Sequence, residues 1–281
     1  MNTINQLNNK LVKPLLSERE ANIRVLTQVM KSSTSNKIMS KHRLQKIISE
    51  ADFCSRRKAE LLILRNKVFV NGLKANIGDK ADPKIDTISI NGYRIQKEVS
   101  RKVILLNKPP GLISSCYDQY GRKTVSAFLP EQHRKGMYPI GRLDFHSRGA
   151  LIITNNGELT LKLTHTKYKL IKTFLAWINC IPSLDQLSDW ESGIDVEGKR
   201  TIPAKVKLIK ISNDKNLLEV KINEERNRQI RKVAFNFGYK VVDLNRISIA
   251  NIDLKNLEER QWRKLSESEW LPIMEKGQIN N

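Results

Sequence analysis

Apolar residues repeat at helical spacing in two stretches after residue 41, at 44–51 and 56–65, and Ser55 stands where the second helix needs a cap. Two β-branched runs follow, and each ends in Asn-Gly, the dipeptide typical of tight hairpins. We therefore expect a small unit of two helices followed by short strands, over residues 41–98.

The pattern changes at residue 101 to a longer series of strands with few helices. Strands are expected at 103–107, 150–154, 171–178, 205–211, 217–222, 240–243 and 247–249, and helices at 158–163 and 227–237. The fold class is therefore α+β. We expect this second domain to span residues 101–270 and a tail to cover 271–281.

Residues 1–40 differ from the rest, being rich in Asn, Ser, Thr and Lys with Glu18 and Glu20 as their acidic residues. We expect a disordered basic extension. An organelle transit peptide and a translation start at Met39 are the alternatives, and no apolar core of a secretory signal is seen.

The net charge of the chain limits its possible functions more than its length does. The 281 residues carry 50 Lys and Arg against 29 Asp and Glu, a net charge of +21. Such an excess favours a polyanionic partner, nucleic acid before an anionic membrane. No apolar run approaches the length of a membrane span.

Cysteine and glycine patterns exclude several other classes. The three cysteines lack metal-ligand spacing, so we expect no metal site, and they fit a reducing compartment such as the cytoplasm. The sequence contains no phosphate-binding glycine loop and no dinucleotide fingerprint, so we expect no cofactor.

Basic residues gather on the two N-terminal helices. Arg43 and Lys46 lie on the first, while Arg56, Arg57 and Lys58 begin the second. Three cations at a helix N-terminus oppose the helix dipole, so a phosphate backbone is a better explanation than a solvated face.

Two further segments carry candidate chemistry. Asp144 ends the run Tyr138-Pro-Ile-Gly-Arg-Leu-Asp144, where a carboxylate can serve as a nucleophile or base or can simply cap a turn. Arg231 ends Glu225-Arg-Asn-Arg-Gln-Ile-Arg231 beside an apolar helical stripe. A half-buried Arg231 needs an anion, and Asp144 is the natural partner.

In this order and spacing, the motifs resemble the RsuA/RluB family of ribosomal RNA pseudouridine synthases. The segments Arg43-Leu-Gln-Lys46, Cys54-Ser-Arg-Arg57 and Val68-Phe-Val-Asn-Gly72 are similar to the RNA-binding domain of ribosomal small-subunit protein four. The segments ending at Asp144 and Arg231, with Thr154-Asn-Asn-Gly157, resemble the family's catalytic motifs.

The resemblance implies a mixed, mostly antiparallel-sheet catalytic domain that acts on a flipped-out uridine without a cofactor or metal. Asp144 would be the catalytic aspartate, held by a salt bridge from Arg231. Arg142, Arg226 and Arg228 would contact RNA.

The sequence departs from the family at two positions. Phe174 stands where the family usually has a tyrosine that stacks on the uracil, and Glu225 stands where it usually has glycine. Phenylalanine keeps the stacking face and lacks the hydroxyl.

The resemblance implies ribosomal RNA as the partner, with the large subunit favoured, and we expect a monomer. A non-catalytic RNA-binding ribosome-assembly factor and a transfer-RNA modifier are the alternatives. Phe174 favours the assembly factor, whereas Asp144 together with Arg231 favours the enzyme.

Overall fold

The computed structural model describes residues 41–95, 100–212, 214–224 and 226–275. Two compact units divide this chain: one holds the described residues up to Ile47 and Leu62–Arg94, and the other holds Ile48–Leu61 and the described chain from Ile95 on. Expectations for residues 1–40, Glu225 and 276–281 lie outside the described residues. No helix in the described ranges is long and apolar enough to cross a membrane.

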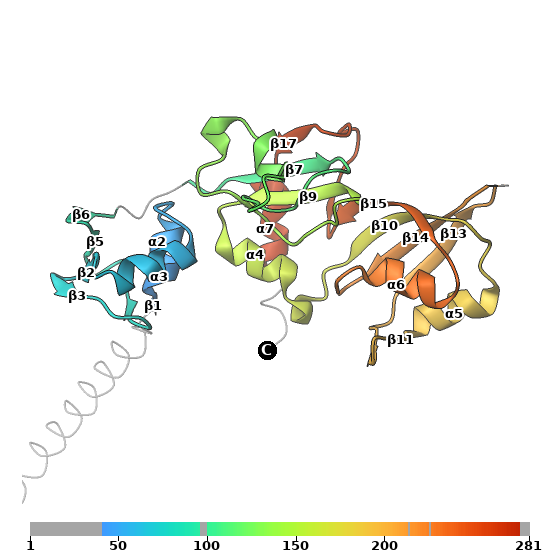
Figure 1. Ribbon diagram of the computed structural model, residues 1–281, viewed down its shortest axis with the longest axis horizontal. Helices are drawn as coiled ribbons and strands as arrows, with labels where there is room; N and C mark the ends of the chain where they lie inside the picture. The colour runs from blue at the N-terminus through green and yellow to red at the C-terminus, as the bar shows by residue number, and fades with distance from the viewer. Residues whose placement is uncertain (1–40, 96–99, 213, 225, 276–281) are drawn as a thin grey trace, which may run out of the picture. The chain divides into compact units, whose positions relative to one another are not determined.

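The N-terminal elements follow the predicted order of two helices and short strands (Figure 1). They are β1 (His42–Arg43), α2 (Leu44–Glu50), α3 (Arg56–Leu64), β2 (Val68–Val70), β3 (Leu73–Lys74), β4 (Lys80–Ala81), β5 (Ile88–Ile90) and β6 (Tyr93–Arg94). The Lys58 amide donates to Ser55 Oγ at 3.3 Å, as a cap should. Asn71 and Gly72 both have positive φ between β2 and β3, which is the geometry of a tight hairpin turn.

A long sheet organises the second part of the chain. Its strands run in the order β13-β14-β10-β15-β9-β7-β17, with β8 paired to β9 and β16 to β15. Every pairing is antiparallel except that of β15 with β9, so the prediction of a mostly antiparallel sheet is confirmed. The bounds are β7 (Val103–Lys108), β8 (Tyr138–Pro139), β9 (Arg148–Thr154), β10 (Lys172–Ile178), β13 (Lys205–Lys210), β14 (Asn216–Ile222), β15 (Val241–Ile249), β16 (Ile252–Asp253) and β17 (Trp262–Lys264).

Helices and the segment 112–143 pack against this sheet, and its central strands are buried on both faces. α4 (Gly157–Thr164) and α7 (Glu267–Glu275) lie beside β7 and β9, while α5 (Leu184–Ser192) contacts β13 and α6 (Gln229–Asn236) contacts β15 (Figure 1). Along β7, Ile104 and Leu106 join one core cluster, whereas Val103 and Leu105 join another. This alternation is why the strand reads as an unbroken apolar run.

The remaining elements are short. They are β11 (Asp195–Val196), β12 (Lys199–Arg200) and the 3₁₀ turns Val125–Phe128, Glu131–His133 and Thr166–Tyr168.

Gly149 makes the parallel pairing of β9 with β15 possible. Its φ is 109°, and it lies opposite Arg246 in the register. A Cβ at this position would overlap the carbonyl oxygen of Arg246 and the side chain of Asn245. Only glycine therefore lets the two backbones approach here, at the start of the strand that follows Asp144.

Three expectations need correction. The strands predicted at 240–243 and 247–249 are one strand, β15, whose pairing with β10 shifts register in two places. Helix α6 begins at Gln229 rather than 227, because Arg228 adopts a left-handed backbone at φ 54°. The tail predicted to begin at residue 271 is wrong up to residue 275, because α7 runs from Glu267 to Glu275 and its Ile273 is 1% exposed within the core.

Candidate active site

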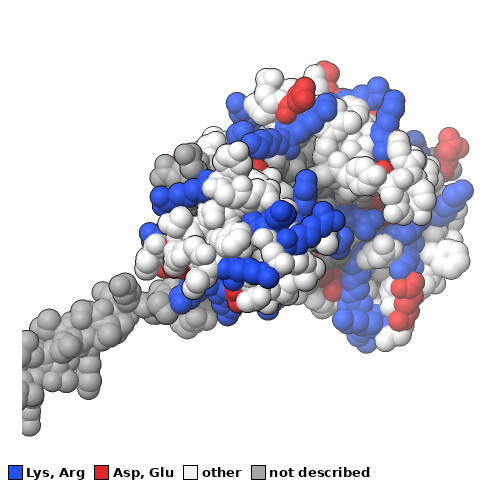
Figure 2. Space-filling view, turned by 60° about the vertical axis from the view of Figure 1, so that its left-hand side comes forward, with Lys and Arg blue, Asp and Glu red and all other residues white. Residues whose placement is uncertain are grey.

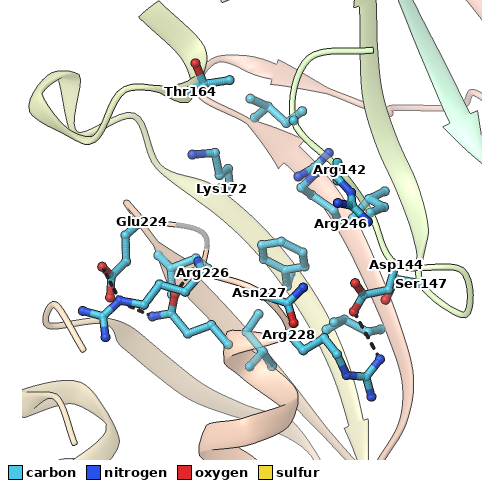
Figure 3. A pocket seen from close by; sticks show the side chains of 18 of the residues that line it. Arg142, Asp144, Ser147, Thr164, Lys172, Glu224, Arg226, Asn227, Arg228 and Arg246 are labelled. Carbon is cyan, nitrogen blue, oxygen red and sulfur yellow. Dashed lines mark hydrogen bonds and ion pairs between the residues drawn. The ribbon is translucent and has the colours of Figure 1, made fainter. Parts of the chain in front are cut away.

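A cavity of about 220 Å³ opens where the β8–β9 loop, β10, β15 and the segment before α6 converge (Figure 3). Its wall includes the charged and polar residues Arg142, Asp144, Ser147, Lys172, Glu224, Arg226, Arg228 and Arg246, together with Phe174. Among the residues predicted for the catalytic domain, the structure thus brings together Arg142, Asp144, Phe174, Arg226 and Arg228. Asp144 is one of two carboxylates in this wall, the other being Glu224, and its side chain is 28% exposed.

Main-chain contacts hold both neighbours of Asp144. The hydroxyl of Ser114 donates to the Leu143 carbonyl at 2.8 Å and accepts from the Leu143 amide at 3.0 Å. The Gly111 amide donates to the Phe145 carbonyl at 2.7 Å. The carboxylate therefore projects from a loop fixed on either side of it.

A buried lysine lies beneath the same loop. Lys108, at the end of β7, is fully buried, and its Nζ donates to the carbonyl oxygens of Pro109 at 3.0 Å, Asp144 at 3.2 Å and Ser147 at 2.8 Å. Burial lowers the pKa of this ammonium to about 8, although the nearby charge of Asp144 raises it. Lys108 thus donates to three main-chain acceptors around the loop, one of which, the Asp144 carbonyl, also accepts from the Ser147 amide at 3.0 Å.

The salt bridge expected between Asp144 and Arg231 is not formed. Among the described residues, Asp144 pairs with Arg228, whose Nη1 lies 3.5 Å from Asp144 Oδ2. The left-handed backbone of Arg228 precedes α6 and turns its side chain toward the cavity (Figure 3). Sequence alone gave no sign of this backbone geometry.

Arg231 lies behind the loop instead. Its Nη1 donates to the Val241 carbonyl at 2.8 Å, and its Nη2 lies 3.5 Å from Ser147 Oγ. The pKa of this guanidinium is lowered by burial and by the Arg228 charge, while Asp144 and Asp243 raise it. Arg231 is half-buried, as expected, and it supports the sheet through the Val241 carbonyl and the loop end through the Ser147 hydroxyl.

A buried carboxylate orders the segment that carries Arg228. Glu224, 5% exposed, accepts hydrogen bonds from the Ile202 amide at 2.8 Å, from Arg226 Nε at 3.1 Å and from Gln229 Nε2 at 3.0 Å. The Gln229 side chain in turn accepts from the Arg226 amide at 3.0 Å. This network fixes both ends of the turn around Arg228.

Phe174 forms an apolar part of the cavity wall. It lies on β10, is 3% exposed, and pairs with Val220 on one side and Arg246 on the other. The guanidinium carbon of Arg246 lies 5.8 Å from the centre of its ring, and Arg246 Nε donates to the Ala150 carbonyl. One flat aromatic face and one cationic group therefore lie together in the wall.

The basic residues predicted on the N-terminal helices occupy α2, α3 and β1. Four of these side chains are exposed: Arg43, Arg56, Arg57 and Lys58. Lys46 is partly buried, and its Nζ lies 3.4 Å from His42 Nδ1. Figure 2 shows that Lys and Arg side chains are spread widely over the face it presents, with few acidic ones among them.

Sequence reasoning missed Lys108, Arg246, Ser147 and Glu224 as parts of the site. Lys108 had one available signal, a lysine closing an otherwise apolar strand. Within the described residues, no group of three or more His, Cys, Asp or Glu side chains is placed to hold a metal ion.

Comparisons with known proteins agree with this geometry. The family model described as RNA pseudouridylate synthase matches residues 102–235, and the S4 domain model matches residues 42–84. The chain is 40% identical over 230 residues to ribosomal large subunit pseudouridine synthase B of Bacillus subtilis, covering 81% of this chain and 93% of that relative. The chain belongs to the RNA pseudouridine synthase family.

Two other matches extend across this pseudouridine synthase. It is 33% identical to the dual-specificity RNA pseudouridine synthase RluF of Escherichia coli, over 82% of this chain and 78% of that relative. A solved structure described as a pseudouridylate synthase superposes with a TM-score of 0.60 at 26% identity, covering 82% of this chain and 99% of that one. The predicted fold of an S4-like domain followed by a mixed, mostly antiparallel catalytic domain is therefore confirmed.

Proposed function

We propose that this pseudouridine synthase converts specific uridines of ribosomal RNA to pseudouridine, with Asp144 as the catalytic carboxylate. The observation that carries the proposal is the position of Asp144 on a fixed loop, at a cavity that also contains the flat face of Phe174. A base inside a duplex is stacked and paired, so the target uridine would have to be flipped out to enter.

The reaction breaks the ribose–nitrogen bond, turns the uracil and rejoins it through carbon 5. Asp144 would act on the ribose or base, either as a nucleophile or by removing a ribose proton. The Arg228 guanidinium beside it favours the ionised carboxylate in both routes. Phe174 would cover one face of the uracil during the turn.

Arg231 takes a positioning role in this proposal. It contacts the main chain of Val241 and the side chain of Ser147, three residues after Asp144. Arg142, Arg226 and Arg228 would receive the phosphates around the flipped nucleotide, and Arg43, Lys46, Arg56, Arg57 and Lys58 would hold more distant RNA.

We further propose large-subunit ribosomal RNA as the substrate, because a relative at 40% identity carries that substrate in its name. A monomer suffices, since one chain supplies the whole cavity wall described above. The bacterial relatives favour a cytoplasmic location.

Pseudouridine mapping of ribosomal RNA tests the function directly. Cells with and without the gene are compared by chemical labelling of pseudouridine and sequencing. We expect at least one large-subunit position to lose its signal without the gene and to regain it when the wild-type gene is restored. An unchanged map would overturn the proposal. A loss confined to small-subunit or transfer RNA would show that this RNA, and not large-subunit RNA, is the substrate.

A further inference from the structure

Two tyrosines project into solvent from one loop beside the active site. Tyr117 is 78% exposed and Tyr120 is 74% exposed, although large aromatic rings are normally at least partly buried. Both belong to the segment 115–123, here called the tyrosine loop. Nothing in the fold requires these rings to face water.

The tyrosine loop is closed at its base. The Ile113 amide donates to the Lys123 carbonyl, and the Val125 amide donates to the Ile113 carbonyl, each at 3.0 Å. These bonds join the two ends of the loop across ten residues.

Hydrogen bonds inside the loop then fix its course. The Asp118 carboxylate accepts from the amides of Tyr120 and Arg122, each at 3.1 Å, and takes two further bonds from the Arg122 guanidinium at 3.0 and 2.7 Å. Ser115 Oγ donates to the Tyr117 carbonyl at 2.7 Å. The loop is thus ordered before any partner binds, which lowers the entropic cost of binding.

The loop also begins next to the catalytic carboxylate. Ser114, the residue before it, is bonded to both main-chain groups of Leu143, the residue before Asp144. The bonds between Ser114 and Leu143 therefore place the start of the tyrosine loop close to Asp144 along the fold, although no residue of the loop lines the cavity itself.

The charge around the rings suits a polyanion. Arg122 lies over one face of the Tyr120 ring, 5.2 Å from its centre, and Tyr120 is still 74% exposed. Lys123 is exposed at the end of the loop. Exposed aromatic rings interleaved with cations are the combination that binds unpaired nucleotides, because every base offers a flat face for stacking.

We propose that Tyr117 and Tyr120 stack with unpaired nucleotides of the RNA substrate next to the target uridine. The inference rests on the proposed function, because it assumes that the RNA enters at Asp144. It assigns the tyrosine loop to recognition of RNA rather than to the isomerisation step.

The test measures the affinity of the full chain for an in-vitro transcript of large-subunit ribosomal RNA. Tyr117→Ser and Tyr120→Ser should each weaken binding by about 5- to 150-fold, the equivalent of about 1–3 kcal/mol per stacked base. The double serine variant loses both stacks and should bind more weakly than either single variant. Tyr117→Phe with Tyr120→Phe keeps both rings and should retain the affinity within about threefold. Leu184→Ser removes an equally exposed apolar side chain on α5 and should leave binding as it is.

Salt dependence separates stacking from charge. The serine variants should keep the wild-type slope of log affinity against log salt, since no phosphate contact is lost. Lys123→Gln is the contrast, because it removes a charge and keeps both rings, and it should lower that slope by about one unit.

The outcomes are distinct. Wild-type affinity in the double serine variant, or an equal loss in the phenylalanine variant, would overturn the proposal while leaving the enzyme assignment intact if the transcript is still isomerised. If the wild-type chain forms no pseudouridine but the serine variants lose affinity, the proposed function fails and the RNA contact of the loop stands.

Discussion

The ammonium of Lys108 lies 3.2 Å from the main-chain oxygen of Asp144 and 2.8 Å from that of Ser147. A fully buried cation thus joins the end of β7 to the loop that presents the proposed catalytic carboxylate. The contact is made to main-chain atoms, so the Asp144 side chain stays available in the cavity.

The Lys108 contact predicts a pH dependence of stability. The pKa of Lys108 is about 8 in the fold and about 10.4 in an unfolded chain. Between these values the unfolded chain binds more protons, so the contribution of Lys108 to the free energy of unfolding rises with pH. Lys108→Met has a side chain of similar length and no titrating group.

The measurement is the free energy of unfolding in urea for both proteins from pH 7 to pH 10. The wild-type value minus the Lys108→Met value should be constant up to about pH 8 and should then increase. A difference that stays flat above pH 8 would show that the folded lysine titrates as in the unfolded chain, and a difference that falls would show that its pKa is raised; either result contradicts the prediction.

Gly149→Ala should destabilise the catalytic domain strongly. The new Cβ needs a disfavoured positive φ and overlaps the Arg246 carbonyl oxygen, and each effect costs about 1–3 kcal/mol. Gly198→Ala is the matched control, because Gly198 has φ 75° with nothing within 4 Å of its Cβ. Urea unfolding should show a clearly larger loss at Gly149, and equal losses would refute the close approach of β9 and β15.

Arg231 and Arg228 should differ in their effect on turnover. Arg228→Asn introduces a residue type that tolerates the left-handed backbone at this position. It removes an exposed ion pair worth at most about 1 kcal/mol, so the rate should fall by about fivefold or less. Arg231→Gln removes bonds from a half-buried charge, worth about 1.5–3 kcal/mol, so a loss of about 10- to 100-fold is expected.

Steady-state kinetics with the same transcript decide between the two arginines. The Arg231→Gln loss should appear in kcat with KM little changed, because Arg231 lies behind the loop. A larger loss of kcat for Arg228→Asn than for Arg231→Gln would contradict this prediction and would show that Arg228, beside Asp144 in the cavity, contributes more to the reaction.

Phe174 tests whether a phenol is needed at the stacking position. Phe174→Tyr should change the single-turnover rate by less than about threefold, whereas Phe174→Ala should lose about 5- to 150-fold with the lost stacking surface. If the hydroxyl takes part in proton transfer, Phe174→Tyr should instead accelerate the reaction by about 10²- to 10⁴-fold. Such a gain would favour a degraded enzyme that mainly binds RNA.

Sequence patterning predicted the elements that rest on local signals. The Asn-Gly hairpins, the capped helix α3 and the apolar strands β7, β9 and β10 follow from turn chemistry and periodicity. These are properties of neighbouring residues, so a single sequence reveals them.

The features that sequence could not give depend on long-range contacts. Lys108 meets Asp144 across 36 positions, and Arg231 meets Ser147 across 84. Asp144 pairs with Arg228 and not with the expected Arg231 because Arg228 has a left-handed backbone, a conformation that arginine rarely adopts. A lysine at the end of an apolar strand hints that Lys108 is unusual, but neither spacing nor residue type shows which residues Lys108, Arg228 and Arg231 contact.

The central claim is that the Asp144 carboxylate carries the isomerisation. Asp144→Asn keeps the side-chain size and removes its charge, so pseudouridine formation in a large-subunit transcript should fall below detection under single-turnover conditions. The affinity for the same transcript should stay within about threefold, because the main-chain bonds of the loop remain. Wild-type turnover in Asp144→Asn, with the protein folded and the RNA bound, would contradict the account.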